Sequence, residues 1–437
     1  MWKRFLLTLI LTIRVTAQDP EERRIAAQGG ELVYFFGAAE KTGKTPLLVA
    51  LHPQVSGPLE KAREHWKFWQ PFCRQRGWML LVPWTGNGTA GSTDQGVKAL
   101  ELIIADAKTR MPVEESRIYL TGFSDAAAGV FYAASRWADL WAAAAALQGS
   151  PVNAINSNCL FGANTVNVPV LWTVGGKDEL YPPSLMEPLR GKLEAASYNL
   201  EWRLDPDLTR EGPLEAAKLD ALLDWLAGHH KEPFPMEVDC ETGNPAFAHC
   251  YWIEMTKFNP ARRNDVLLTS RVPPGSGAAL AFGPFGYNPA GTGPGVEVVW
   301  LPEKYSGPLR LKDRIVSIAG SAIAGPQEYV KYMDAVREEK TVAVMLGRGT
   351  ARMRIETKII LPQRAENVTA RVQGHYLLDQ KEIQIVSRAV TELRLAVPPH
   401  WIPAKLTWNG SELGQADTPG CWLLNWATEP PTAKKCN

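Results

Sequence analysis

Apolar strand-like runs alternate with amphipathic helical runs from residue 45 to about residue 228. Parallel strands need a crossover connection, usually a helix, so this alternation predicts a mostly parallel sheet with helices on both faces. The expected strands are 46–52, 78–84, 117–122, 142–147, 168–175 and 199–204, and the two clearest helices are 93–110 and 213–227. Ligands of such sheets bind beyond the carboxyl ends of the strands, where we therefore look for a site.

Composition and charge exclude some classes of structure and function. The chain of 437 residues is 45 % hydrophobic and 21 % charged, which is enough to bury at least two ordinary cores. Its 47 basic and 46 acidic residues leave a formal net charge of +1. Because no global field attracts a polyanion, nucleic acid is not an expected partner. The 33 prolines, 36 glycines and 16 tryptophans argue against an all-helical bundle.

The first residues have the pattern of a secretory signal peptide. Lys3 and Arg4 precede a nine-residue apolar run, 5–13, and Val15-Thr16-Ala17 lies where cleavage needs small side chains. Nine helical residues cover about 14 Å, less than half of a bilayer core, so an uncleaved anchor is the weaker alternative. We expect cleavage near Ala17, a secreted or periplasmic protein, and no transmembrane span in the rest of the chain.

Six cysteines in an exported chain could form three disulfides, in any of fifteen pairings. Proximity in the sequence favours Cys240 with Cys250 and Cys421 with Cys436, which leaves Cys73 and Cys159. None of them has the paired spacing of a zinc site, so we expect structural thiols or bridges and no metal.

The segment that could carry chemistry is Gly122-Phe123-Ser124-Asp125-Ala126, which follows the expected strand 117–122 and precedes a helix rich in small residues. A strand, a sharp turn and a helix form the nucleophile elbow of serine hydrolases, which needs small neighbours around the serine. Gly122 meets this need, and Ala126 stands where glycine is usual. The alternative interpretation is an ordinary turn between a strand and a helix.

Two more strand ends could contribute to the same site. The first expected strand ends in His52-Pro53-Gln54, and because Pro53 has no N–H, Gln54 or Val55 would have to supply one oxyanion donor beside the N–H of Asp125. Strand 168–175 ends before Lys177-Asp178-Glu179, where the acid of a Ser, Asp, His set is expected. A surface aspartate in a turn is the alternative for Asp178.

Residues 45–232 resemble the α/β-hydrolase superfamily, in particular phospholipase/carboxylesterase and polyhydroxybutyrate-depolymerase-like esterases. The resemblance covers under half of the chain and implies Ser124 as nucleophile, Asp178 as acid, and the amides of Asp125 and Gln54 as the oxyanion hole. In that superfamily the histidine base lies in the loop after the last strand. The corresponding loop here, 205–213, contains no histidine.

The missing imidazole puts the activity in question, because one group must take the serine proton near neutral pH and return it to the leaving group. His229 and His230 follow the last helix, about 22 Å from the expected position. His52, which we expect to brace its loop, and His65 or His249 stay open as a base. We therefore expect an incomplete or relocated triad.

A segment from about 278 to 362 resembles a bacterial PDZ domain. The residues that carry the resemblance are Gly295-Val296-Glu297-Val298-Val299 and the run from Leu309 to Gly320, in which Lys312 replaces a usual glycine. The resemblance implies a groove for a peptide C-terminus, lined by Phe282 and Gly283 from a carboxylate loop and by Tyr329 and Met333 from a helix over 326–340. The alternative is that Tyr329, Met333 and Val336 are only the core stripe of that helix.

These observations predict a signal peptide over 1–17, an α/β-hydrolase-like domain over 18–232, a β-sandwich-like domain over 233–265 and 363–437, and a PDZ-like domain inserted over 266–362. The predicted function is an exported, esterase-like serine hydrolase acting on a carboxylic ester or small peptide without a cofactor. The alternative is a non-catalytic scaffold that binds a peptide through its PDZ-like module.

Overall fold

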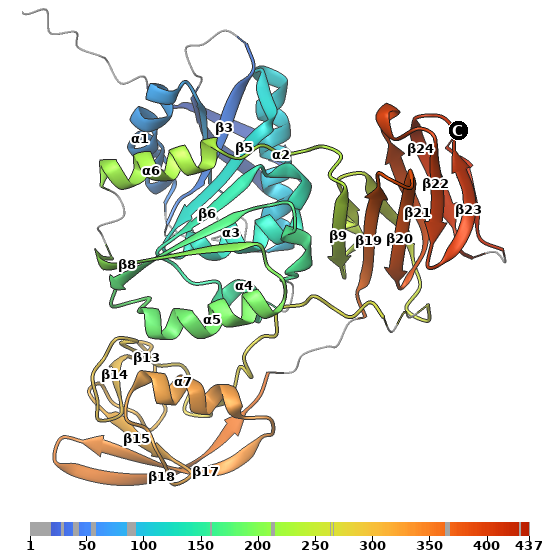
Figure 1. Ribbon diagram of the computed structural model, residues 1–437. Coiled ribbons are helices and arrows are strands. Elements are labelled where there is room, and N and C mark those ends of the chain that lie inside the picture. The colour runs from blue at the N-terminus through green and yellow to red at the C-terminus, as the bar shows by residue number, and fades with distance from the viewer. Residues whose placement is uncertain are drawn as a thin grey trace, which may run out of the picture.

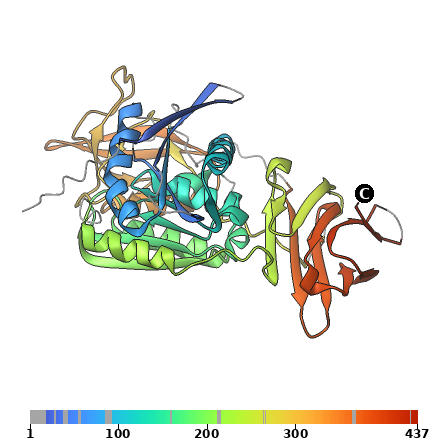
Figure 2. The same ribbon diagram turned by 90° about the horizontal axis from the view of Figure 1, so that it is seen from above.

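The computed structural model describes residues 19–27, 30–37, 43–53, 58–84, 93–157, 160–210, 215–262, 264, 266–362, 368–427 and 430–436. The predicted signal peptide, Gln54 and Cys159 lie outside these residues. The chain forms an α/β lobe, an inserted module below it in the view of Figure 1, and a C-terminal unit at its side (Figures 1 and 2).

An eight-stranded sheet with the order β1-β2-β4-β3-β5-β6-β7-β8 forms the centre of the α/β lobe. Its strands are β1 (Glu21–Ala27), β2 (Gly30–Gly37), β3 (Thr45–Leu51), β4 (Met79–Trp84), β5 (Val113–Phe123), β6 (Ala143–Leu147), β7 (Val170–Lys177) and β8 (Leu200–Thr209). All neighbours from β4 to β8 are parallel, so the predicted mostly parallel sheet is confirmed. The alternation did not reveal β1 and β2, which add an antiparallel hairpin at one edge.

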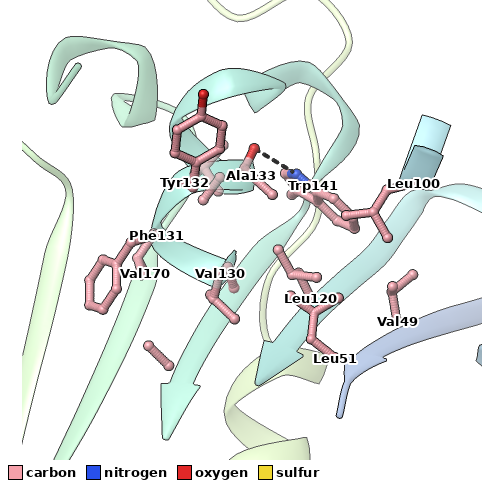
Figure 3. Close-up of a cluster of buried hydrophobic side chains, with 14 of the residues drawn as sticks. Val49, Leu51, Leu100, Leu120, Val130, Phe131, Tyr132, Ala133, Trp141 and Val170 are labelled. Atoms are coloured by element: carbon pink, nitrogen blue, oxygen red, sulfur yellow. Dashed lines mark hydrogen bonds between the residues drawn. The ribbon is translucent and has the colours of Figure 1, made fainter. Parts of the chain in front are cut away.

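Helices cover both faces of this sheet because successive strand residues point to opposite sides. The helices are α1 (Leu59–Arg76), α2 (Asp94–Arg110), α3 (Ala126–Arg136), α4 (Val152–Asn156), α5 (Pro183–Ala195) and α6 (Ala216–Ala227). Val49 and Leu51 of β3 pack with α2 and α3 on one face, while Leu48 and Ala50 pack with α1 and α6 on the other. Figure 3 shows the first core, in which Trp141 Nε1 donates to the carbonyl of Ala133 at 3.2 Å.

Strand β8 departs from the expected loop over 205–213. It continues through Asp205, Pro206 and Asp207 to Thr209, with a register irregularity against β7 between the pairs at Gly175 and Lys177. Pro206 is tolerated because β8 is the edge strand, where a missing N–H breaks no ladder inside the sheet. The longer strand carries Arg210 toward the carboxyl end of the sheet.

The C-terminal unit consists of two five-stranded sheets, ordered β10-β11-β21-β24-β25 and β23-β22-β20-β19-β9. The strands are β9 (Glu237–Thr242), β10 (His249–Cys250), β11 (Ile253–Phe258), β19 (Ala370–Leu377), β20 (Glu382–Arg388), β21 (Val390–Val397), β22 (Ala404–Trp408), β23 (Ser411–Ala416), β24 (Gly420–Asn425) and β25 (Thr432–Lys435). Buried side chains of both sheets form one cluster around Trp252, Trp401 and Trp408.

Both disulfides favoured by sequence proximity are present. Cys240 of β9 bonds to Cys250 of β10 and thereby joins the two sheets, and Cys421 of β24 bonds to Cys436. Cys73 is a free, buried thiol on α1, and burial raises its pKa to about 12. Such a thiol is a packing residue rather than a nucleophile.

The inserted module has its own sheet, its own helix and its own core. The sheet has the order β12-β18-β17-β15-β14-β13, with β16 paired to β15. Its elements are β12 (Ala279–Leu280), β13 (Gly286–Tyr287), β14 (Val296–Trp300), β15 (Arg314–Ile318), β16 (Ser321–Ala322), α7 (Pro326–Ala335), β17 (Lys340–Arg348) and β18 (Ala351–Ile360). The helix expected to reach residue 340 ends at Ala335, because Val336 is extended (ψ 133°) and leads the chain toward β17.

A buried carboxylate on β9 fastens the chain segments that enter and leave the module. Glu241 Oε2 accepts from the N–H and hydroxyl of Ser270 at 2.6 and 2.9 Å, and Oε1 accepts from Thr269 at 2.7 Å and from Thr369. Arg388 Nη2 donates to the same Oε1 at 2.8 Å and balances its charge.

The same region is tied to the α/β lobe. The side chain of Asn164 donates to the carbonyl of Glu241 at 2.9 Å and accepts from its N–H at 2.7 Å. The entering segment also bonds to the lobe, because Gly162 N–H donates to Ser270 O and Val272 N–H donates to Leu160 O, both at 2.9 Å. Lobe, module and C-terminal unit therefore meet around Glu241.

We predict that Glu241→Ala lowers the free energy of unfolding by about 3–5 kcal/mol, because it leaves the Arg388 charge and several buried donors without their acceptor. Urea unfolding followed by tryptophan fluorescence measures the loss. Glu356→Ala, at an exposed side chain whose ion pair with Arg354 is 3.5 Å long, is the matched control and should change stability by no more than about 0.5 kcal/mol. Equal unfolding midpoints for Glu241→Ala and the wild type would contradict the importance of this network.

Candidate active site at Ser124

Ser124 lies in a tight turn between β5 and α3. Its φ of 61° is in the left-handed region that non-glycine residues rarely adopt, and its N–H donates to Leu147 O on β6 at 2.9 Å. A Cβ at Gly122 would come within 2.7 Å of the carbonyl oxygen of Ala126, so the turn requires glycine there. The local geometry is that of a nucleophile elbow.

Asp178 follows β7 and is only 2 % exposed. Its Oδ1 accepts from the backbone N–H groups of Leu180 and Tyr181, at 2.8 and 3.0 Å. Oδ2 is buried and has no hydrogen-bond partner among the described residues. The carboxylate is therefore fixed in orientation and needs a positive neighbour.

Arg210 supplies that neighbour and reaches Ser124 at the same time. Its Nη2 donates to Ser124 Oγ at 2.6 Å, and its Nη1 lies 3.7 Å from Asp178 Oδ1. The guanidinium lies over the ring of Tyr181, 5.2 Å from the ring centre. Burial raises the pKa of the Tyr181 phenol, and hydrogen bonding with Ser124 opposes that rise.

The structure thus brings Ser124 and Asp178 to one site and joins them through a guanidinium. A guanidinium has five N–H donors and no acceptor, so it can orient and polarise the serine hydroxyl but cannot take its proton. From the resemblance we expected a histidine in 205–213, and we did not predict a role for Arg210. Its sequence signal is that it is the only basic residue in that segment.

None of the seven histidines, all of which lie in the described part of the chain, has a hydrogen bond to Ser124. His52 Nδ1 is 2.9 Å from the carbonyl of Pro53, as expected for a residue that braces its loop, and burial lowers its pKa. His65 Nε2 accepts from Trp69 at 3.0 Å, and desolvation lowers the pKa of His65 to about 3. His229 contacts the Trp225 carbonyl at 2.8 Å.

Of the two expected oxyanion donors, Gln54 lies outside the described residues. Asp125 is exposed and stands at the N-terminus of α3, where backbone N–H groups and the helix dipole favour a partial negative charge. Ser124, whose hydroxyl accepts from Arg210, precedes Asp125 by one residue, so both features belong to the same turn.

The expected peptide-binding residues of the module are largely core residues. Phe282, Tyr329 and Met333 belong to its buried cluster, and the Phe282 carbonyl accepts from the Tyr305 hydroxyl at 2.6 Å. Gly283 has a φ of 81° in the turn after Phe282. Tyr329 and Met333 also line a cleft toward the α/β lobe.

Within the described ranges, no three His, Cys, Asp or Glu side chains gather as a metal site would require. No described helix has the length and apolar content that crossing a bilayer requires.

No protein-family model matches the chain, and no curated protein matches its sequence. Solved structures similar to it include a thermostable esterase (17 % identity, TM-score 0.40), Est1E from Butyrivibrio proteoclasticus (15 %, 0.37) and the Pyrococcus horikoshii acylaminoacyl peptidase (12 %, 0.38). The matches cover 48, 47 and 49 % of this chain and 63, 99 and 42 % of those chains, respectively. The chain thus spans less than two thirds of the first structure and of the peptidase. We base the function on the geometry of the site.

His249 of the C-terminal unit contacts Asp139 of the α/β lobe. His249 Nδ1 lies 2.6 Å from Asp139 Oδ2 in the 3-10 helix η1 (Ala138–Leu140), and this hydrogen bond raises the pKa of His249. A raised pKa in the folded state stabilises the fold below the unfolded value of about 6.5, and this contribution is lost as the pH rises through the folded pKa.

We predict that His249→Gln lowers the melting temperature at pH 5.5 and has little effect at pH 8.5. Thermal melts of both proteins across this range measure the difference. His400→Gln, at a histidine on the C-terminal unit that lacks a carboxylate partner among the described residues, is the control. A loss of equal size at both pH values would contradict the ion-pair interpretation.

Proposed function

We propose that this protein is an exported binding protein of α/β-hydrolase type, which holds an uncharged acyl compound such as a carboxylic ester at Ser124 without cleaving it at the rate of a serine esterase. The observation that carries the proposal is the 2.6 Å contact from Arg210 Nη2 to Ser124 Oγ, between the serine and Asp178.

The charges of the site support an uncharged ligand. Arg210 is balanced by Asp178 at 3.7 Å, so a carboxylate entering the site would compete with a buried acid for the same guanidinium. A carbonyl oxygen needs only donors, and Arg210 and the amide of Asp125 provide them. Among the described residues no histidine has a hydrogen bond to Ser124, so we expect the hydroxyl to stay a weak nucleophile and the bound ester to persist.

Two features support export. The segment 1–17 has the composition of a signal peptide with cleavage near Ala17, and the disulfides Cys240–Cys250 and Cys421–Cys436 are typical of oxidising compartments. We include secretion or a periplasmic location in the proposal.

Slow ester hydrolysis is the second candidate function. It is favoured by the position of the Asp125 amide at the N-terminus of α3, where it could stabilise an oxyanion formed at Ser124. An oxyanion site without a complete triad can still accelerate hydrolysis roughly 10³-fold over water. Ser124 and the Asp125 amide would act in this reaction as nucleophile and oxyanion donor.

Peptide capture by the PDZ-like module is less well supported than ester binding. In its favour, β13 is an edge strand beside α7, where an extended peptide could add to the sheet. Against it, the rings of Phe285 and Tyr287 pack on Tyr329 at 6.3 and 5.6 Å and occupy the space between this strand and the helix. We also propose that the C-terminal unit is a β-sandwich-like domain, because its two sheets share one buried core.

We predict that a fluorophosphonate probe does not label the wild type above the background of Ser124→Ala, because no histidine of the described residues has a hydrogen bond to Ser124 and its hydroxyl accepts from Arg210. The two proteins should also hydrolyse p-nitrophenyl butyrate at the same rate. Gel fluorescence and absorbance at 400 nm are the readouts. Fast labelling of the wild type that is lost in Ser124→Ala would overturn the proposed binding function and favour ester hydrolysis, the second candidate.

Binding of an ester is measured separately by calorimetry with methyl butyrate. Arg210→Gln should weaken binding roughly tenfold, the effect of losing one hydrogen bond from a charged donor. Arg203→Gln is the matched control, since Arg203 lies on β8, which ends one residue before Arg210, and pairs with Glu201 on the surface. Equal affinities for Arg210→Gln and Arg203→Gln would contradict the role of Arg210.

A further inference from the structure

A large cleft separates the α/β lobe from the inserted module, and the site at Ser124 does not by itself explain it. The cleft has a volume of about 1090 Å³, and α5 and α7 form facing walls. Figure 1 shows α7 of the module opposite α5 of the lobe. Pockets for small molecules are commonly 300–1,000 Å³, so this cleft is large enough for an extended ligand.

The walls are mainly apolar. Leu180, Leu185 and Leu189 contribute from the lobe, and Tyr329, Val330 and Met333 contribute from α7. Leu180 is 40 % exposed and Val152 is 36 % exposed, so apolar surface inside the cleft stays in contact with water. Covering this surface with an apolar ligand would be favourable.

Two polar contacts hold the walls together in the described part of the chain. Lys192 Nζ lies 3.2 Å from Asp334 Oδ2, and Gln327 Nε2 donates to Ser184 Oγ at 2.7 Å. These contacts connect α5 and α7 across the cleft.

The cleft adjoins the site at Ser124 through Tyr181. Leu180 and Tyr181 line the cleft, and the ring of Tyr181 also carries the Arg210 guanidinium that holds Ser124. A ligand whose polar end lies at Ser124 can thus extend past Tyr181 between α5 and α7.

The chemistry of the walls favours an alkyl chain over a peptide. Between the first and last turns of α5 and α7, the backbone N–H and C=O groups are used inside the helices, so these parts of the walls offer no ladder to an extended peptide. Pro273 and Pro274, which also line the cleft, have no N–H to donate. An unbranched hydrocarbon needs no such partners.

We propose that the cleft between α5 and α7 binds the alkyl chain of a medium- or long-chain fatty acyl ester whose carbonyl lies at Ser124. This inference rests on the proposed ester-binding function and names its ligand class. The inserted module contributes one wall of the site, so the ligand bridges lobe and module.

The test compares methyl octanoate with methyl butyrate as probes by calorimetry on the full chain. The wild type should bind the octanoate at least about tenfold more tightly, because each buried methylene adds to the affinity. Val152→Ser and Val330→Ser should reduce this ratio to below about threefold while leaving the butyrate affinity unchanged. Leu311→Ser, at a 59 % exposed leucine of the module outside the cleft, is the matched control and should keep the ratio.

The outcomes separate this inference from the function on which it rests. A chain-length ratio near one in the wild type, or a ratio that both cleft variants retain, overturns the inference. If Arg210→Gln leaves the affinity for both esters unchanged, the ester site at Ser124 is refuted instead. If Arg210→Gln lowers the affinity for both esters equally and preserves the chain-length ratio, the result supports both the alkyl-chain cleft and the ester site at Ser124. Circular dichroism melts establish that Val152→Ser and Val330→Ser are folded, and Leu189→Ser, at another residue that lines the cleft, replaces either one that is not.

Discussion

The arrangement of the whole chain depends on one buried carboxylate. Glu241 accepts hydrogen bonds from the segments that enter and leave the inserted module, while its backbone bonds to Asn164 of the α/β lobe. A buried carboxylate needs several donors and an opposite charge, and Arg388 supplies the charge. Because the segment at Ser270 is also bonded to residues 160–162 of the lobe, the module starts from a fixed point close to α5. The cleft beside α7 follows from this attachment.

A second buried carboxylate explains the residues around Ser124. Asp178 is kept at the end of β7 by two backbone donors, and an unbalanced charge at that depth would be costly. An imidazolium would balance it in a complete triad, whereas here Arg210 does so and donates to the serine as well. Arg210 thus lies between the two polar side chains of the site, at hydrogen-bond distance from the serine hydroxyl and 3.7 Å from the carboxylate.

Sequence alternation was sufficient to predict the parallel part of the lobe, because buried parallel strands and their helices have distinct patterns. The hairpin β1–β2 was missed since Glu21–Ala27 is mostly charged and partly exposed. The extension of β8 was missed because Pro206 normally indicates a loop, and an edge position was needed to accommodate it. Arg210 could not be assigned from the sequence, since its role depends on that extension and on the depth of Asp178. Lys312 adopts a left-handed φ of 69°, a conformation that the sequence analysis did not predict for this residue.

The strained turn at Ser124 is not in itself a sign of catalysis. Its left-handed φ costs about 1–2 kcal/mol, which persists only where the surroundings enforce it. The surroundings here are structural: β5 must enter α3 with Gly122 against the Ala126 carbonyl, and a Cβ at Gly149 would lie 1.9 Å from the Ser124 carbonyl oxygen. Close packing of β5, β6 and α3 would impose the same turn whether or not the hydroxyl reacts. The turn at Ser124 therefore reflects the packing of the fold. The reactivity of Ser124 depends on the groups that contact its hydroxyl, and among the described residues these include the guanidinium of Arg210.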